Sequence, residues 1–175
     1  MIRRVLLLLA LGVALVAAGC GGDDGGSASG TEATATASPA ATQAPAAPDL
    51  TDTSTKPVIE PPSGDPPAEL VKEDIVKGKG PGAKRGDTVV VNYVGLNFSN
   101  GREFDASWDS GATFPVQLGT GSVIAGWEKG LIGIKEGGRR KLVIPPELGY
   151  GAQGYPPDIP PNETLIFVID AVSIN

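Results

Sequence analysis

The stretch TVVVNYVGLNFSNGREFDA, residues 88–106, decides the fold of this chain. Its first part, residues 88–98, is rich in β-branched and aromatic side chains, which favour a strand over a helix. Asn100-Gly101 follows, and both residues tolerate the positive φ that a tight hairpin turn requires. The stretch therefore predicts two antiparallel strands, residues 88–98 and 102–106.

Outward from this hairpin, short apolar runs separated by glycine-containing turns predict four more strand segments. They are residues 70–76, which suit a sheet edge, and residues 114–118, 139–144 and 164–174. The last segment alternates apolar and other residues, as expected of a strand with one buried face.

One segment, residues 122–131, has helical periodicity. Ser122 is its candidate N-cap, and an apolar face recurs at Val123, Ile124, Trp127 and Leu131. Gly126 and Gly130 each weaken a helix by ~1 kcal/mol relative to alanine, so packing must stabilise it. The expected fold is α+β: an antiparallel sheet of about five strands with one short α-helix on a face.

The first 68 residues differ in composition from the rest. Arg3 and Arg4 precede an apolar run, residues 5–18, that is shorter than the ~20 residues of a bilayer span, so residues 1–19 predict a signal peptide. Cys20 follows Ala-Ala-Gly, which resembles the lipidation site of bacterial lipoproteins. An ordinary secretory signal with an incidental cysteine is the alternative, and the export route, general secretory or twin-arginine, stays open.

Residues 20–68 are expected to be a disordered linker after the lipidated cysteine, because glycine, alanine, threonine and proline cannot bury enough apolar area to fold. Residues 69–175 contain every aromatic side chain and are expected to be the folded domain. The predicted location is therefore outside the cytoplasm, at a bacterial membrane that the acyl chains hold.

Composition excludes several kinds of chemistry. The chain has no histidine and one cysteine, which rules out histidine bases, histidine metal sites, zinc fingers and internal disulfides, so no metal or cofactor is expected. Residues 69–175 carry 11 basic and 13 acidic side chains, which disfavours nucleic acid as a partner. The basic run Arg139-Arg140-Lys141 is expected to be solvated on a strand.

Several short motifs occur in one order and spacing. They are Tyr93-Val94-Gly95, GREFDAS at residues 101–107, VIAGWEKGL at 123–131, IPPELGYG at 144–151 and IPPNETLIF at 159–167. Together they resemble the FK506-binding family of peptidyl-prolyl isomerases over residues 84–174. The resemblance implies a sheet wrapped around one helix, with a shallow apolar pocket for a proline ring between them.

The resemblance also implies the roles of individual residues. The catalytic group would be Tyr93, Asp105, Tyr150 and Phe167. Substrate would also contact Phe104, Phe114, Val123, Ile124, Trp127 and Ile159, with Trp127 as the floor. The Ile124 amide and the Tyr150 hydroxyl would donate to substrate carbonyls. Two positions depart from the family pattern: Ser110 replaces an arginine near Asp105, and Tyr155 replaces a frequent histidine.

The function that these residues imply is cofactor-free isomerisation of X-Pro bonds in exported polypeptides as they fold, by a monomer that also accepts macrolides of the FK506 type. An apolar pocket can lower the rotation barrier of ~18–20 kcal/mol without a covalent step, because it favours the twisted, less polar amide. The alternative is a catalytically weak adaptor or chaperone of the same fold that holds proline-containing partners.

Overall fold

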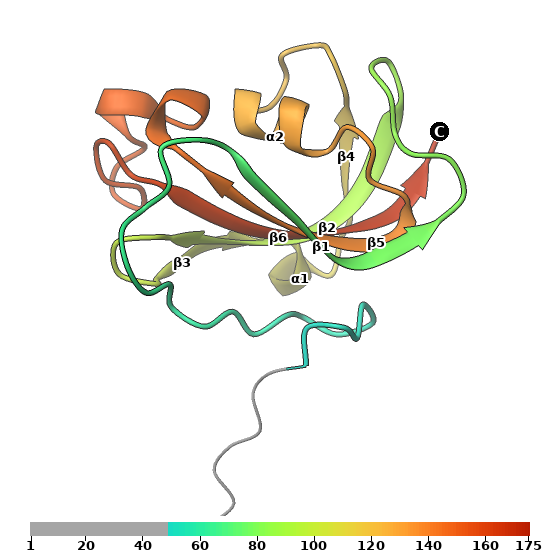
Figure 1. The fold of residues 1–175 in the computed structure, drawn as a ribbon, viewed down its shortest axis with the longest axis horizontal. Helices are drawn as coiled ribbons and strands as arrows, with labels where there is room; N and C mark the ends of the chain where they lie inside the picture. Colours follow the sequence, from blue (N-terminus) through green and yellow to red (C-terminus); the bar gives the residue numbers. More distant parts are fainter. Residues whose placement is uncertain (1–48) are drawn as a thin grey trace, which may run out of the picture. The chain divides into compact units, whose positions relative to one another are not determined.

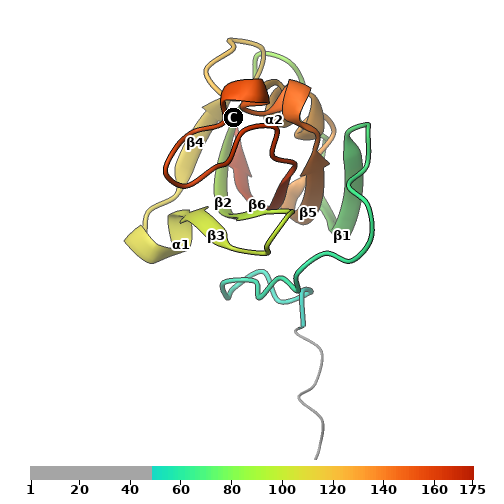
Figure 2. The ribbon, with the colours of Figure 1, turned by 90° about the vertical axis from the view of Figure 1, so that its left-hand side faces the viewer.

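The computed structural model describes residues 49–175 (Figure 1). The predicted signal peptide, Cys20 and the linker up to residue 48 lie outside the described residues. The described chain forms one antiparallel sheet, with helix α2 on one face and helix α1 and residues 49–67 on the other (Figures 1 and 2).

The sheet has six strands, one for each predicted segment, and their ends differ from the predicted ones by at most three residues. The strands are β1 Val71–Lys79, β2 Thr88–Asn97, β3 Glu103–Ala106, β4 Phe114–Gln117, β5 Glu136–Ile144 and β6 Leu165–Ile174. Their order is β1-β5-β6-β2-β3, and β4 also pairs with β2. β4 pairs with the first half of β2 and β3 with the second half, so the two short strands share one edge.

The predicted helix is shorter than expected. Helix α2 covers Ala125–Gly130, and its N-cap is Ile124, which has an extended ψ of 148° and no capping side chain, so Ser122 is not the N-cap. Three further short helices were not predicted: α1 Ser107–Ser110 and the 3-10 turns η1 Pro146–Leu148 and η2 Gly151–Gln153. Each is a single turn of three or four residues, which is too short to show periodicity.

Helix α2 lies close to β5 because its two glycines have no side chain. A Cβ at Gly126 would collide with Ile144, and one at Gly130 would lie 2.5 Å from a methyl carbon of Leu142. At the end of α2, Arg140 donates hydrogen bonds to the carbonyls of Gly130 at 2.8 Å and Ile132 at 3.0 Å. Packing against β5 and this cap therefore stabilise a helix whose own sequence is weak.

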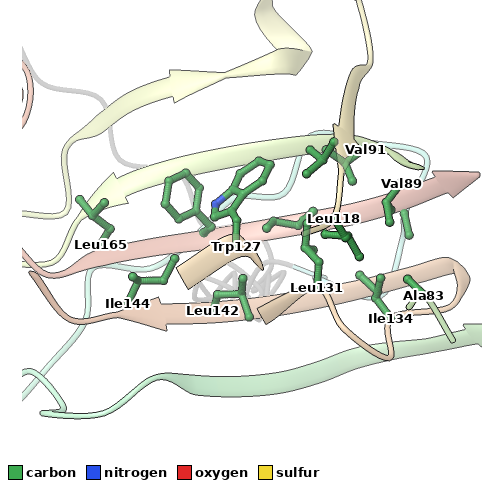
Figure 3. Packing of buried hydrophobic residues seen from close by; sticks show 14 of the residues in the cluster. Ala83, Val89, Val91, Leu118, Trp127, Leu131, Ile134, Leu142, Ile144 and Leu165 are labelled. Atoms are coloured by element: carbon green, nitrogen blue, oxygen red, sulfur yellow. The ribbon is translucent and has the colours of Figure 1, made fainter. Parts of the chain in front are cut away.

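The main core lies between α2 and the sheet (Figure 3). Leu131, Leu142 and Leu165 are fully buried there, and Trp127 is 4% exposed. A second apolar cluster lies on the opposite face and consists of Val94, Leu96, Ala106, Val143 and Ile166. Both faces of the central strands are thus buried, which explains the long apolar run of β6.

The expectation that the basic run 139–141 is solvated is wrong for its first two residues. Arg139 is 0% exposed and forms an ion pair with Asp170, and Arg140 is 6% exposed and pairs with Asp74. Burial raises the pKa of the Asp170 carboxyl, and the guanidinium of Arg139 opposes that shift. Buried guanidinium groups require such partners, and here the carboxylates come from β1 and β6, the two strands that pair with β5.

The expectation of a disordered linker up to residue 68 is also wrong for its last part. Residues 49–67 lie against the sheet: Pro57 is buried, and Ile59 packs on the second apolar cluster. The carbonyls of Leu50 and Thr55 accept hydrogen bonds from Arg139. A proline-rich segment cannot form a core of its own, but it can cover one that a sheet already presents.

Candidate functional site

A cavity of about 420 Å³ opens between α2, β4, β6 and the residue that precedes η2. It is lined by Phe114, Ser122, Val123, Ile124, Trp127, Tyr150 and Phe167. Six of these seven residues were predicted from the sequence as site residues. A larger groove of about 880 Å³ lies between the ends of β1 and β6, but it contains no aromatic side chain and none of the predicted residues.

Trp127 forms the floor of an aromatic box. Its ring meets the rings of Tyr93 and Phe167 edge to face, with centroids 5.1 and 5.2 Å away, and that of Phe114 at 6.4 Å. Its indole N–H is buried and has no acceptor in the described part of the chain. Edge-to-face contacts fix the rings relative to one another, so the floor is a rigid and largely apolar surface.

Phe104 extends this box from β3. Its ring lies edge to face on Phe167 at 5.6 Å, and this contact is possible because residue 95 on the intervening strand β2 is glycine. A Cβ at Gly95 would lie 2.7 Å from Phe167 and 2.8 Å from Phe104, inside normal contact distance. Gly95 is thus a site residue that sequence reasoning quoted only as part of a motif.

Tyr93 and Asp105 form the polar wall. The Tyr93 hydroxyl donates a hydrogen bond of 2.6 Å to the Asp105 carboxylate. Burial first, and then this bond, raise the pKa of the Tyr93 phenol. Ser110 forms no hydrogen bond with Asp105, because its hydroxyl donates instead to the Ser107 carbonyl. Asp105 and Phe104 line a neighbouring hollow of about 500 Å³ rather than the 420 Å³ cavity.

Two hydrogen-bond donors at the rim have no partner among residues 49–175: the Tyr150 hydroxyl and the Ile124 amide. Tyr150 is 38% exposed, and burial, with the nearby charge of Asp105, raises the pKa of its phenol. Its ring lies beside that of Tyr155, with centroids 5.8 Å apart. Both donors are therefore free to bind a carbonyl of an incoming chain.

The loop that carries Ile124 is held by Glu128 of α2. The Glu128 carboxylate accepts hydrogen bonds from the amides of Gly119 and, at 2.8 Å, Gly121. These hydrogen bonds place Ser122 in the cavity wall, whereas the sequence predicts it as a helix N-cap. A side chain in an irregular loop leaves no periodic signal, so the sequence does not mark Ser122 as a site residue.

Ile159 occupies a different place from the one expected. It is 2% exposed in the main core and pairs with Tyr155 in a short bridge, and it does not line the cavity. Its role is to hold the loop that carries Tyr155. Within the described ranges, no group of three histidine, cysteine or acidic side chains is placed to hold a metal ion.

Comparison with known proteins identifies this arrangement. A sequence model of the FKBP-type peptidyl-prolyl cis-trans isomerases matches residues 80–172. The chain belongs to this family. It is therefore a prolyl isomerase of a family that binds proline-containing substrates and FK506-type ligands.

Relatives match over nearly their whole length. The FK506-binding protein of Streptomyces anulatus is 52% identical over 120 residues, which are 68% of this chain and 97% of the relative. The probable FK506-binding protein of Corynebacterium glutamicum is 48% identical over 118 residues, 67% and 98% of the two chains. Residues 69–175 number only 107, so both matches include residues ahead of Glu69.

Two solved structures share the fold. The crystal structure of FkpA from Escherichia coli is 46% identical with a TM-score of 0.55, and the match covers 61% of this chain and 48% of FkpA. The crystal structure of AtFKBP13 is 36% identical with a TM-score of 0.57, covering 62% and 94%. These likenesses agree with the six-stranded antiparallel sheet and its few short helices.

Proposed function

We propose that this isomerase acts outside the cytoplasm on proline-containing segments of exported proteins, as a monomer anchored by lipid at Cys20. The export pattern of residues 1–20 supports this location. In the described part of the chain, no helix is long and apolar enough to cross a membrane. The apolar run of residues 5–18 is also short for a span, so stable attachment would depend on the acyl chains.

The aromatic box is the proposed seat of catalysis. An X-Pro amide is planar because resonance places negative charge on its oxygen, and water stabilises that form. A proline ring that enters the box leaves water behind and meets rigid apolar rings. The twisted amide is less polar than the planar one, so the box binds it relatively better and lowers the rotation barrier.

The rim donors supply orientation. The Ile124 amide and the Tyr150 hydroxyl would bind substrate carbonyls on either side of the proline and hold the chain while the bond turns. The Tyr93 hydroxyl holds the Asp105 carboxylate through a hydrogen bond of 2.6 Å. In the bound substrate, this carboxylate would lie beside the carbonyl carbon of the twisted amide. Isomerisation is a rotation about the C–N bond, so it requires no covalent step and no proton transfer, and the carboxylate and the rings act only through their positions.

The observation that carries this proposal is the combination of a buried aromatic floor with two rim donors that have no partner among residues 49–175. The test of the activity is a protease-coupled assay of the full chain on a proline-containing peptide, with and without an FK506-type macrolide. We expect acceleration that the macrolide abolishes. Acceleration that persists with the macrolide bound would place catalysis elsewhere.

The anchor has a separate test. The Cys20→Ser variant should move from the membrane fraction to the soluble fraction after an alkaline wash, while the Ser27→Ala control stays in the membrane. If Cys20→Ser remained fully membrane-bound, residues 5–18 would be the anchor instead.

A weakly catalytic adaptor is the second candidate. It is favoured by one observation: among residues 49–175 no cationic side chain forms an ion pair with Asp105, and Ser110 stands where many members of the family carry arginine. An adaptor would bind the peptide with micromolar or better affinity and leave the isomerisation rate near that of the uncatalysed reaction.

A further inference from the structure

We propose that residues 49–67, here called the strap, are a working part of the isomerase domain that positions strand β3, and that Lys56 is a positioning residue for isomerisation. The inference rests on the proposed function, because β3 carries Phe104 and Asp105. The strap runs beneath β3 and α1, on the face opposite α2 (Figures 1 and 2).

The strap is anchored by a buried charge. Arg139 of β5 is 0% exposed, and its ion pair with Asp170 uses two donors, at 2.5 and 2.8 Å. Two further donors point to the strap and reach the carbonyls of Leu50 at 3.1 Å and Thr55 at 3.0 Å. Without the strap these donors would be buried and unpaired, or exposed to water through a gap.

The strap carbonyls are held in place by local turns. Asp49 accepts hydrogen bonds from the amide and hydroxyl of Thr51, and Asp52 does the same for Ser54. These bonds lower the pKa of both aspartates. The turn geometry is therefore defined by bonds within the strap itself, and such local order reduces the entropy lost on docking to Arg139.

Lys56 of the strap forms ion pairs at both ends of the β3 segment. Its ammonium group contacts Glu103 at the start of β3 and Asp109 in α1, each at 2.7 Å. Phe104 and Asp105 lie between these two carboxylates in the sequence. Lys56 thus ties together both ends of the segment that presents two site residues.

The strap also makes apolar contacts with the β2–β3 hairpin. Ile59 packs on the second apolar cluster, which includes Ala106 of β3. Pro61 lies against the hairpin turn, where a Cβ at Gly101 would be 2.9 Å from it. The strap therefore contacts the β2–β3 hairpin at its turn, at its underside and at its end.

Strand β3 needs this support because its own pairing is slight. It has four residues, pairs only with β2, and has an irregular register between Gly95 and Leu96. Its other edge has no strand partner within residues 49–175. The matches to the relatives from Streptomyces anulatus and Corynebacterium glutamicum extend ahead of Glu69 and cover 97% and 98% of those two proteins. These relatives therefore contain residues that match the end of the strap, but they have no long segment ahead of it.

The test uses the full chain and the substitution Lys56→Ala. We expect kcat/KM to fall about two- to fivefold, as the loss of two half-exposed ion contacts allows, at temperatures well below melting. Lys56→Arg should restore kcat/KM, because arginine keeps the cation between Glu103 and Asp109. The control is Lys72→Ala, an exposed lysine of β1 that makes no ion pair within residues 49–175.

A second readout separates positioning from stability. If β3 shifts, the Tyr93 to Asp105 bond loosens, and the pKa of Tyr93 moves back toward its ordinary value in the Lys56→Ala protein. A purely structural lysine would lower Tm and leave both kcat/KM of the folded protein and the Tyr93 titration unchanged, and that result would overturn the proposal.

The strap and the site can fail separately. If Tyr150→Phe lowers kcat/KM but Lys56→Ala does not, the aromatic site stands and the strap has no positioning role. If Lys56→Ala lowers kcat/KM and shifts Tyr93 while Tyr150→Phe has no effect, the positioning role stands and the assigned role of Tyr150 fails.

Discussion

Gly95→Ala is the substitution that most directly perturbs the aromatic box while adding only one carbon. The new Cβ would lie 2.7 Å from a ring carbon of Phe167 and 2.8 Å from one of Phe104. The Phe167 ring cannot turn away freely, because it is 4% exposed and also meets Trp127 at 5.2 Å. One or both rings must therefore move out of the box.

The expected cost follows from overpacking. Inserting a methyl group into a packed site costs ~1–3 kcal/mol, and the alanine regains ~0.5–1 kcal/mol because glycine is unfavourable within a strand. The net cost is then ~0–2.5 kcal/mol, and a value of ~1–2 kcal/mol in the middle of this range lowers the Tm of a domain of this size by roughly 4–10 °C. Because the rings that move also contact the substrate, kcat/KM measured on folded protein should fall by roughly three- to tenfold.

The assay is thermal unfolding together with protease-coupled isomerisation, on Gly95→Ala and on Gly95→Ala combined with Phe104→Leu. The smaller leucine should relieve the collision, so the two substitutions should be less destabilising together than the sum of their separate effects. Unchanged Tm and unchanged kcat/KM for Gly95→Ala would refute the claim that the two rings are packed in contact across residue 95.

Three other expectations concern charge and stability. Asp170→Asn leaves Arg139 buried without a counter-charge and should destabilise by ~3–5 kcal/mol in a melt, whereas Arg139→Met combined with Asp170→Leu should cost much less. The pKa of Tyr93 is raised in the folded state, so the stability that this shift contributes is fully present below the ordinary pKa of 10.0 and is lost as pH rises through the folded-state pKa. In thermal melts at alkaline pH, the Tyr93→Phe protein should not show this loss of stability. A chain that starts at Glu69 should melt at a lower temperature than one that starts at Asp49, because the strap no longer covers Arg139 and the second apolar cluster, and equal melting temperatures would contradict the strap contacts.

The strands were predictable because each carries its own signal. β2 is dense in β-branched residues, Asn100-Gly101 marks its turn, and β6 alternates along its length. Six of the seven residues that line the cavity were also predicted, since their motifs occur in a fixed order. For these parts, local sequence and family resemblance agree.

The remaining features depend on partners that are distant in sequence. The sequence predicts that Arg139 and Arg140 are solvated, because their carboxylate partners, Asp170 and Asp74, lie on other strands that only the fold brings beside them. The strap has the composition of a linker, and only the face of a sheet that it covers makes it ordered. Helix α2 is short because Ile124 takes an extended conformation that its apolar periodicity does not reveal.

The measurement that tests the account most directly is kcat/KM of Tyr150→Phe on a proline-containing peptide, together with its Tm. The substitution removes the Tyr150 hydroxyl, which has no partner among residues 49–175, and keeps the ring; a lost hydrogen bond is worth ~0.5–1.5 kcal/mol. We expect kcat/KM to fall by roughly 2–12-fold with Tm almost unchanged. A Tyr150→Phe protein that loses several degrees of Tm but keeps full activity per folded molecule would show that the hydroxyl is structural and would contradict the assigned site.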